Sequence, residues 1–290
     1  MEITKYLESK LKEEYSCDIN RILSGYDVVR KTTFRVNSLK SSYEEIKNAL
    51  DKNFIKYEKV NWYKDAFIID HTIDIRNLDI YKQGKIYVQS LSSMLPVLIL
   101  DPKENESVLD MAAAPGSKTT MIASLTNNKC RIMANEKDKI RYERLKYNIN
   151  MQGLKNINVS NNDALKLDEF FRFDKILLDV PCSGSGTINE NNIKYFSEKL
   201  VLNSQKLQIS LLKKAISLLK VGGTIVYSTC SILKEENELV LNEVLKNDAV
   251  KLEKIDLDVP KLFVSIDGTI CVCPTNEYEG FFVAKLTKIK

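Results

Sequence analysis

From Ser107 onward, short apolar segments alternate with amphipathic ones, and this alternation constrains the fold more than any other feature of the sequence. The strand-like segments are SVLDM (107–111), RIMANE (131–136), INVSNND (157–163), DKILLDVP (174–181), TIVYSTC (224–230) and GFFVAKLTK (280–288). Helices are expected between them at 118–125 and 138–151. Strands that alternate with helices predict a doubly wound, Rossmann-like α/β sheet.

A longer helix is expected before the fifth of these strands. Its apolar stripe has helical spacing and consists of Ile209, Leu212, Ile216 and Leu219. Gly222-Gly223 follows this stripe, and glycine commonly ends a helix. The sequence therefore predicts that the helix runs up to this pair.

The first 85 residues follow a different pattern. An amphipathic helix is expected around Leu7 and Leu11, and a second helix at 41–53, where a serine stands near the start. Strand-like segments are KTTFRVNS (31–38), FIKYEKV (54–60) and AFIID (66–70). We therefore expect a small α+β domain at 1–85, followed by a larger domain at 86–290.

Composition narrows the function classes. With 44% hydrophobic residues, the 290-residue chain can bury a sizeable core, but its longest clear apolar run, 94–100, is too short to span a membrane. The first fifteen residues carry charges throughout, so we expect a cytoplasmic protein with reduced thiols rather than an exported one. The net charge of +4 is compatible with a polyanionic partner without establishing one.

Cysteine and histidine usage disfavours a metal centre. The six cysteines include no C-x-x-C pair, and His71 is the only histidine. A structural zinc site needs four such ligands at recognisable spacing, so we expect no metal. A single histidine also weakens mechanisms in which histidine activates a serine or a cysteine.

The segment DMAAAPGSKTT (110–120) directly follows the first strand of the larger domain, where open α/β sheets bind ligands. Its small residues, Ala112, Ala113, Ala114 and Gly116, allow a ligand to approach the backbone closely. Ser117 replaces the glycine that precedes lysine in a Walker phosphate loop, and the segment does not match G-x-G-x-x-G. A redox dinucleotide is therefore disfavoured.

Acidic residues stand at the ends of the next three strands. Glu136 is suited to ribose hydroxyls, Asp163 to an adenine edge, and Asp179 lies at the end of the fourth strand. Each one alone is more simply explained as an ordinary loop or helix-capping acid. As an ordered set they favour an adenosine ligand with a positive centre, such as S-adenosylmethionine.

Cysteines follow two of the later strands. Cys182 comes after the fourth strand, on a turn rich in glycine and serine, and Cys230 ends the fifth. A single cysteine in such a protein is usually a small core residue, but these two strands are neighbours in a doubly wound sheet, so both thiols would face one site. Carbon 5 of cytosine becomes nucleophilic only after a thiolate adds to carbon 6, and a second group must then remove the carbon-5 proton. A carboxyl such as Asp179 could hold the base.

Taken in order, four motifs resemble the Sun (Fmu-like) family of RNA cytosine carbon-5 methyltransferases. They are DMAAAPGSKT, ANEKDKIRYERL, LLDVPCSGSG and YSTCSILKEENE. The resemblance extends from about Thr32 to the C-terminus, because KTTFRVNSLK and EGFFVAKL also look like the family. It implies an RNA substrate, transfer or ribosomal, and S-adenosylmethionine as cofactor.

The resemblance also implies roles for individual residues. Cys230 would be the covalent nucleophile, Cys182 would assist product release, and Asp179 would contact the target cytosine. Lys118 would contact the methionine carboxylate or organise catalysis, two alternatives that stay open. The expected cofactor contacts are Ala112, Ala113, Ala114, Pro115, Gly116, Ser117, Lys118, Glu136, Arg141, Asp163 and Asp179. We expect a monomer that acts on an unpaired or flipped cytosine.

The chain departs from the family pattern in three respects. Ala112 stands where the family often has cysteine, and Ser117 where it often has a second glycine. No sequence follows Lys290 for the extra RNA-binding domain of some members, which leaves the substrate open. Arg35 and Asn37 lie in the small domain, which resembles an RNA-recognition domain or serves as a structural cap.

Two rival functions remain at this point. In a DNA cytosine methyltransferase Cys182 itself would be the nucleophile, but the Thr-Cys motif at Cys230 would then be unexplained, and no long target-recognition segment interrupts the later strands. The second rival is a non-catalytic RNA-binding factor that retains the fold. The intact cysteine pair argues against this non-catalytic function.

Overall fold

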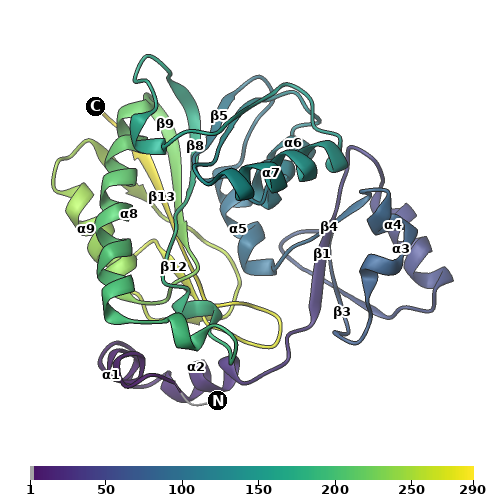
Figure 1. Cartoon of the computed structure of the whole chain (residues 1–290), viewed down its shortest axis with the longest axis horizontal. Helices are drawn as coiled ribbons and strands as arrows, with labels where there is room; N and C mark the ends of the chain where they lie inside the picture. The colour runs from purple at the N-terminus through teal and green to yellow at the C-terminus, as the bar shows by residue number, and fades with distance from the viewer. Residues whose placement is uncertain (1–2) are drawn as a thin grey trace.

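The computed structural model describes residues 3–290, and within them two sheets stand side by side (Figure 1). The smaller sheet has four strands in the order β2-β3-β1-β4, all antiparallel. Its strands are β1 (Thr32–Val36), β2 (Tyr57–Lys59), β3 (Ala66–Ile69) and β4 (Ile86–Val88), and the helices beside it are α3 (Tyr43–Lys52) and α4 (Asp79–Lys82). The sheet thus continues past residue 85, the boundary expected from the sequence.

The larger sheet has nine strands, in the order β11-β12-β13-β9-β8-β5-β6-β7, with β10 paired to β13. Strands β9, β8, β5, β6 and β7 are parallel, and β13 is antiparallel to β9. The bounds are β5 (Ser107–Asp110), β6 (Arg131–Asn135), β7 (Ile157–Ser160), β8 (Phe173–Asp179), β9 (Leu219–Thr229), β10 (Val250–Glu253), β11 (Lys261–Leu262), β12 (Ile270–Val272) and β13 (Phe281–Lys288). The expected doubly wound sheet is confirmed, with an antiparallel extension at one edge.

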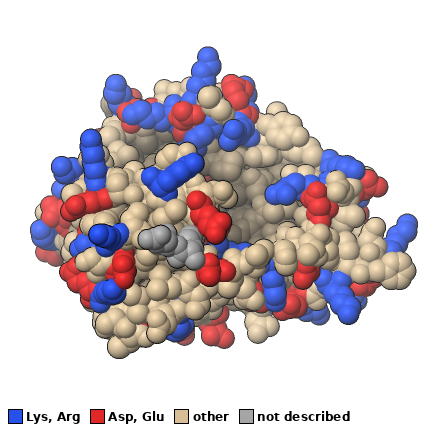
Figure 2. Space-filling model, turned by 60° about the horizontal axis from the view of Figure 1, so that its bottom comes forward, with Lys and Arg blue, Asp and Glu red and all other residues tan. Residues whose placement is uncertain are grey.

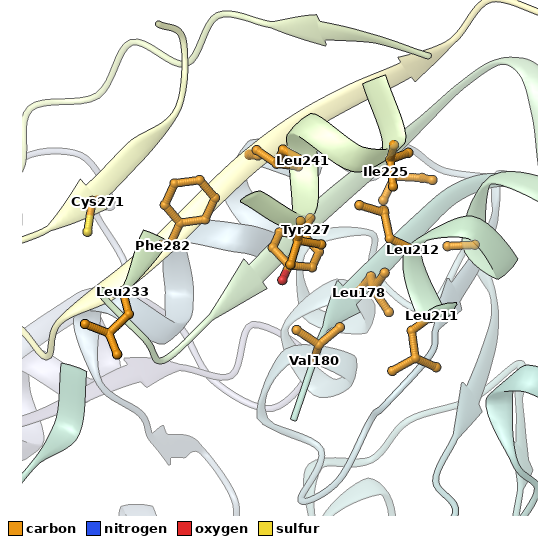
Figure 3. Close-up of a cluster of buried hydrophobic side chains, with 14 of the residues drawn as sticks. Leu178, Val180, Leu211, Leu212, Ile225, Tyr227, Leu233, Leu241, Cys271 and Phe282 are labelled. Carbon is orange, nitrogen blue, oxygen red and sulfur yellow. The ribbon is translucent and has the colours of Figure 1, made fainter. Parts of the chain in front are cut away.

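Helices cover both faces of this sheet (Figure 1). One layer contains α5 (Leu91–Leu100), α6 (Ser117–Leu125) and α7 (Lys139–Gln152), and the other contains α8 (Glu198–Leu218) and α9 (Glu238–Leu245). Successive residues of a strand point to opposite faces. Accordingly, Leu178 and Tyr227 pack with α8 and α9, as Figure 3 shows, whereas Leu177 packs in the core cluster that includes α5 and α6.

The expected end of the long helix is wrong. Helix α8 ends at Leu218, and β9 begins at the next residue, so Gly222-Gly223 lies inside a strand rather than at a helix end. Gly222 has a φ of +80°, and the pairing of β8 with β9 shifts register between Phe173 and Lys175. The glycines accommodate this irregularity in the ladder.

The N-terminal helices pack against the larger sheet instead of the smaller one. Helices α1 (Lys5–Glu14) and α2 (Ile19–Tyr26) contribute Leu7, Leu11 and Ile22 to the core that contains α8 and β9. Tyr15, which directly follows α1, donates a hydrogen bond of 2.5 Å to the carbonyl of Ile232. The helix expected around Leu7 is present and supports the larger domain.

Candidate active site

The two cysteines of interest meet at the carboxyl ends of β8 and β9. These strands are parallel neighbours, and Asp179 at the end of β8 lies opposite Ser228 in β9. The loops that follow therefore start side by side. Cys182 and Cys230 have Cα atoms 6.4 Å apart, and their sulfur atoms are paired as a disulfide. The expectation that both sulfur atoms face one site is confirmed.

This pairing corrects the expectation of reduced thiols throughout. The two cysteines are 48 residues apart in the sequence, and this separation does not reveal that they pair. The expectation of reduced thiols rested on the lack of an export signal and not on how the strands place the cysteines. Neighbouring parallel strands bring the two Cα atoms within the range that a disulfide bridges. The other four cysteines are free: Cys17, Cys130, Cys271 and Cys273.

A buried carboxylate holds the loop that carries Cys182. Glu236 accepts hydrogen bonds from the backbone N–H of Ser183 at 2.8 Å and from its hydroxyl at 2.5 Å. Gln208 of α8 donates to Glu236 at 3.1 Å and to the carbonyl of Pro181 at 2.9 Å, so the loop is fixed on both sides of the cysteine. Burial raises the pKa of Glu236. Sequence reasoning missed this residue, because KEENE looks like an exposed charged turn.

The loops after β8 and β9 are also joined to each other. The N–H of Gly186 donates to the carbonyl of Cys230 at 2.9 Å, and the hydroxyls of Ser185 and Ser231 lie 2.7 Å apart. A Cβ at Gly186 would lie 2.1 Å from the carbonyl oxygen of Gly280, so only glycine fits there. The position of Cys230 relative to Cys182 is therefore set by several contacts besides the sulfur pair.

Lys118 and Asp179 form an ion pair beside the cysteines. The Nζ of Lys118 lies 2.7 Å from Oδ2 of Asp179 and donates to the hydroxyl of Ser93 at 2.9 Å. It also stands 5.8 Å from the ring centre of Phe281. Ser228 donates to the other carboxylate oxygen of Asp179 at 2.7 Å. Lys118 thus lies next to Asp179, and both roles left open for it, a contact to the methionine carboxylate and the organisation of catalysis, stay predictions.

The loop 111–116 connects β5 to α6 and is held open by its neighbours. The N–H of Ala113 donates to the carbonyl of Asn135, and Arg141 donates to the carbonyl of Ala114 at 2.7 Å. Gly116 has a φ of +106°, and a Cβ there would lie 3.0 Å from the side chain of Leu145. Ala112 and Ser117 are half-buried, and Pro115 is exposed. Ala113, Ala114 and Gly116 are buried, so Ala112, Pro115 and Ser117 are the exposed or half-buried residues of this segment.

The acidic residues expected to hold a nucleoside lie around this loop. Glu136 is buried, its Oε1 accepts from the N–H of Asp138, and its Oε2 has no hydrogen-bond partner within residues 3–290, with the closest cation, Arg141, 3.6 Å away. A buried carboxylate oxygen without a partner is costly unless a ligand donates to it. Asp163 caps a short helical turn, and its ion pair with Lys137 at 2.8 Å lowers its pKa.

One acid at the site was not singled out from the sequence. Asp110, the last residue of β5, is fully buried and accepts a hydrogen bond of 2.6 Å from Thr119. Burial raises its pKa to about 7. Asp110 and Thr119 therefore join the end of β5 to the first turn of α6.

Arg35 and Asn37 do not face outward from the small domain. Arg35 is fully buried and donates to Gln89, to the carbonyl of Ser117 and to Thr120, while Asn37 donates to the carbonyls of Gly84 and Gln152. Both side chains join the small sheet to the larger domain. An RNA-contacting role for these two residues is therefore replaced by a structural one, because both side chains are buried between the small sheet and the larger domain.

Two absences concern the part of the chain that the structure describes. Within residues 3–290, no group of three or more His, Cys, Asp or Glu side chains is arranged to hold a metal ion. None of the described helices combines the length and the apolar character that crossing a membrane requires.

Comparison with known proteins adds the following. The family model described as 16S rRNA methyltransferase RsmB/F matches residues 97–287, and a model of its ferredoxin-like domain matches residues 4–76. Ribosomal RNA small subunit methyltransferase F of Vibrio cholerae is 36% identical over 89% of this chain, but the match covers only 58% of that protein. The chain thus spans little more than half the length of this relative.

Two other proteins match over nearly their whole length. A tRNA (cytosine(49)-C(5))-methyltransferase of Pyrococcus abyssi is 34% identical, with 98% of this chain and 97% of that protein covered. The crystal structure of NSun6 from Pyrococcus horikoshii with SFG has a TM-score of 0.90 and 25% identity, and covers 99% of this chain and 98% of that one. The fold and the order of the domains are therefore shared with these proteins.

Proposed function

The chain belongs to the 16S rRNA methyltransferase RsmB/F family, in agreement with its resemblance to Sun (Fmu-like) proteins, and from this premise we propose that it methylates carbon 5 of a cytosine in RNA. The observation that carries the proposal is the meeting of Cys182 and Cys230 beside the Lys118–Asp179 ion pair. A thiolate nucleophile, a second thiol and a carboxylate are the groups that this reaction needs.

We assign the steps as follows. With the disulfide reduced to two thiols by a cellular thiol, the Cys230 thiolate adds to carbon 6 of cytosine, and carbon 5 then takes the methyl group. Cys182 accepts the carbon-5 proton, directly or through water, and the bond between carbon 6 and Cys230 breaks, which returns the electron pair to sulfur. As the thiolate adds, ring nitrogen 3 takes up a proton from water, and the Asp179 carboxylate accepts a hydrogen bond from the resulting N–H; this proton returns to water when the bond between carbon 6 and Cys230 breaks. Lys118 keeps the carboxylate oriented.

S-adenosylmethionine is the proposed cofactor, and it supplies the methyl group on a positive sulfur. The solved relative named above was crystallised with SFG, an analogue of this cofactor. Within this chain, the small residues of 112–116 and Oε2 of Glu136, which accepts no hydrogen bond within residues 3–290, fit a nucleoside with ribose hydroxyls. The other members of the proposed set are Ser117, Lys118, Arg141, Asp163 and Asp179.

The proposed substrate is RNA, with the target cytosine unpaired or flipped so that both faces of its ring are reachable. One relative acts on small-subunit ribosomal RNA and another on tRNA, so both classes are candidates. We further propose a cytoplasmic monomer with a small N-terminal domain and a catalytic domain, and we place the division between them after β4 (Ile86–Val88) rather than at 85/86, because β4 belongs to the small sheet.

The test is a covalent trap. RNA that contains 5-fluorocytosine should form an adduct that survives denaturation, because fluorine cannot leave carbon 5 as a proton does. Cys230→Ala should abolish the adduct and methyl transfer, whereas Cys182→Ala should accumulate an adduct with ordinary RNA. Cys130→Ala, a buried cysteine outside the site, is the matched control.

Three outcomes would contradict the proposal. An adduct with DNA alone, or one that persists without Cys230, would favour the DNA methyltransferase mechanism with Cys182 as nucleophile. A reduced wild-type protein that transfers no labelled methyl group to any unmodified RNA pool would favour a non-catalytic RNA-binding protein.

A further inference from the structure

Two cavities lie along strand β4, and both are lined by Arg76 and Val88. We propose that together they form one groove, here called the β4 groove, which binds the single-stranded RNA next to the target cytosine. This inference rests on the proposed function, because it assigns the part of the molecule that holds the same RNA. Figure 2 shows a hollow between the larger and the smaller part of the molecule, with charges of both signs at its rim.

The first cavity, of about 350 Å³, adjoins the catalytic end of the sheet. Gln89 lines it and donates to the carbonyl of Ser93, whose hydroxyl accepts from Lys118. Glu279 also lines it, and its carbonyl accepts from Ser92 at 2.7 Å. A strand of RNA that leaves the catalytic site therefore meets this cavity directly.

The polar side chains of the first cavity fit a sugar–phosphate chain. They include Arg30, Lys31, Thr32, Thr33, His71, Thr72, Gln89 and Ser90. Lys31 is paired with Glu277 at 2.8 Å, so net positive charge is not what distinguishes this cavity. The hydroxyls of Thr32, Thr72 and Ser90 instead supply hydrogen bonds to riboses and phosphates, because Gln89 and Thr33 are buried and already hydrogen-bonded within the protein.

The second cavity, of about 220 Å³, is lined by three aromatic side chains: Tyr81, Tyr87 and Tyr147. Tyr147 on α7 is 66% exposed, so one face of its ring is open to a partner. Tyrosine rings that face a cavity stack on unpaired nucleobases, which is how single-stranded RNA is commonly held. Asn148, the next residue, donates to the carbonyl of Pro115, so this cavity adjoins the proposed cofactor loop.

Polar groups in the second cavity fit a base edge. Gln152 lines the cavity, and its amide nitrogen donates to the carbonyl of Ile86. Its Oε1 is buried and lacks a hydrogen-bond partner within residues 3–290. An amino or imino group of a base, admitted by a small shift of the neighbouring side chains, would satisfy this acceptor.

Arg76 stands where the two cavities meet. Its side chain is 66% exposed, and its contact with Asp74 is 4.0 Å long, at the limit of an ion pair. An exposed guanidinium between a polar cavity and an aromatic one matches the phosphate that links two nucleotides. Strand β4 is also the end strand of its sheet, and Gln152 of α7 covers part of its outer edge by donating to the carbonyl of Ile86.

The test measures binding of a labelled twelve-nucleotide single-stranded RNA of mixed sequence with one cytosine, by fluorescence anisotropy on the reduced full chain. Tyr147→Ala should weaken binding by about 5- to 160-fold, the range measured for one stacked base, and Tyr147→Phe should restore it. Arg76→Gln should reduce the slope of log Kd against log salt by roughly one unit. Phe170→Ala removes a more exposed ring near the start of β8, at the opposite end of the strand from Asp179, and should not change the binding.

The two proposals fail in different ways. If the wild type methylates RNA but Tyr147→Ala and Arg76→Gln bind the oligonucleotide as tightly as Phe170→Ala does, the groove assignment is wrong and the groove is left for another partner, such as a protein segment. If the wild type methylates no RNA, the proposed function itself fails. Because Tyr147 and Arg76 are mostly exposed, neither substitution should change the unfolding temperature, which is the check on folding.

Discussion

The cysteine end of the large sheet and the interface between the two sheets are both rich in polar contacts, but they are built differently. At the cysteine end, Asp179, Cys182 and Cys230 come from the tips of two neighbouring strands. At the interface, Arg35 and Asn37 reach partners 54 to 115 residues away in the sequence. The first arrangement follows from strand order, and the second depends on how two domains pack.

The two regions also differ in how far their side chains are exposed to a ligand. The carboxylate of Asp179 and the two sulfur atoms are half-buried and within reach of a ligand. The guanidinium of Arg35 is completely enclosed, and burial lowers its pKa to about 10. We therefore expect substitutions at the cysteine end to change the reaction and those at the interface to change stability.

The largest effect should come from the redox state of the cysteine pair. A disulfide occupies both sulfur atoms, so the oxidised protein should transfer no methyl group and should form no adduct with 5-fluorocytosine RNA. A dithiol reductant should restore both, because it leaves two free thiols in place. Methyl transfer can be measured before and after reduction, with the cysteine state read by mass spectrometry. Equal activity of the oxidised form would remove these cysteines from the mechanism.

Glu236→Ala should have the next largest effect, although Glu236 touches no reacting atom. Without its carboxylate, the loop at Ser183 loses two hydrogen bonds and Cys182 shifts, and a misplacement of about 1 Å can cost roughly 10²-fold in rate. From the role in product release that we propose for Cys182, the variant should accumulate the RNA adduct and lower kcat more than it changes KM. Glu236→Gln keeps an acceptor for the N–H of Ser183 and should recover much of the rate. A fall in stability with normal release would show that Glu236 is structural only.

Arg35→Met should act on the other region. It leaves the buried acceptors on Gln89 and Thr120 without their donor, and each buried acceptor left unpaired costs about 1–3 kcal/mol. Chemical denaturation should show this loss, while kcat of the folded fraction should stay near the wild-type value. Arg144→Met, at an exposed arginine of α7, is the matched control for the loss of charge. A large fall in kcat without loss of stability would place Arg35 in the chemistry.

The same contrast explains what could be predicted from the sequence. The parallel strands and their acidic or cysteine ends were predicted, because each lies in one continuous segment with a clear period. Helix α5 was missed because its residues are apolar nearly all round and include Pro96, so it shows no amphipathic stripe. Strand β4 is too short to stand out. Glu236 and Arg35 carry no local sign of burial, since only tertiary packing encloses them.

Asp110 combines the two regions, because it ends a strand as Asp179 does but is enclosed as Arg35 is. Its pKa is about 7 in the folded protein and near 3.8 in the unfolded chain. As the pH rises between these values, the unfolded chain releases the proton that the folded protein keeps, so the folded state loses stability. Asp110→Asn cannot titrate, so its stability does not fall in this way. The free energy of unfolding of the variant minus that of the wild type should therefore increase by about 1 kcal/mol per pH unit between pH 5 and 6.5. Urea denaturation of both proteins at several pH values measures this gain. A constant difference across that window would mean that Asp110 stays ionised in the fold, as an acid at an open strand tip would.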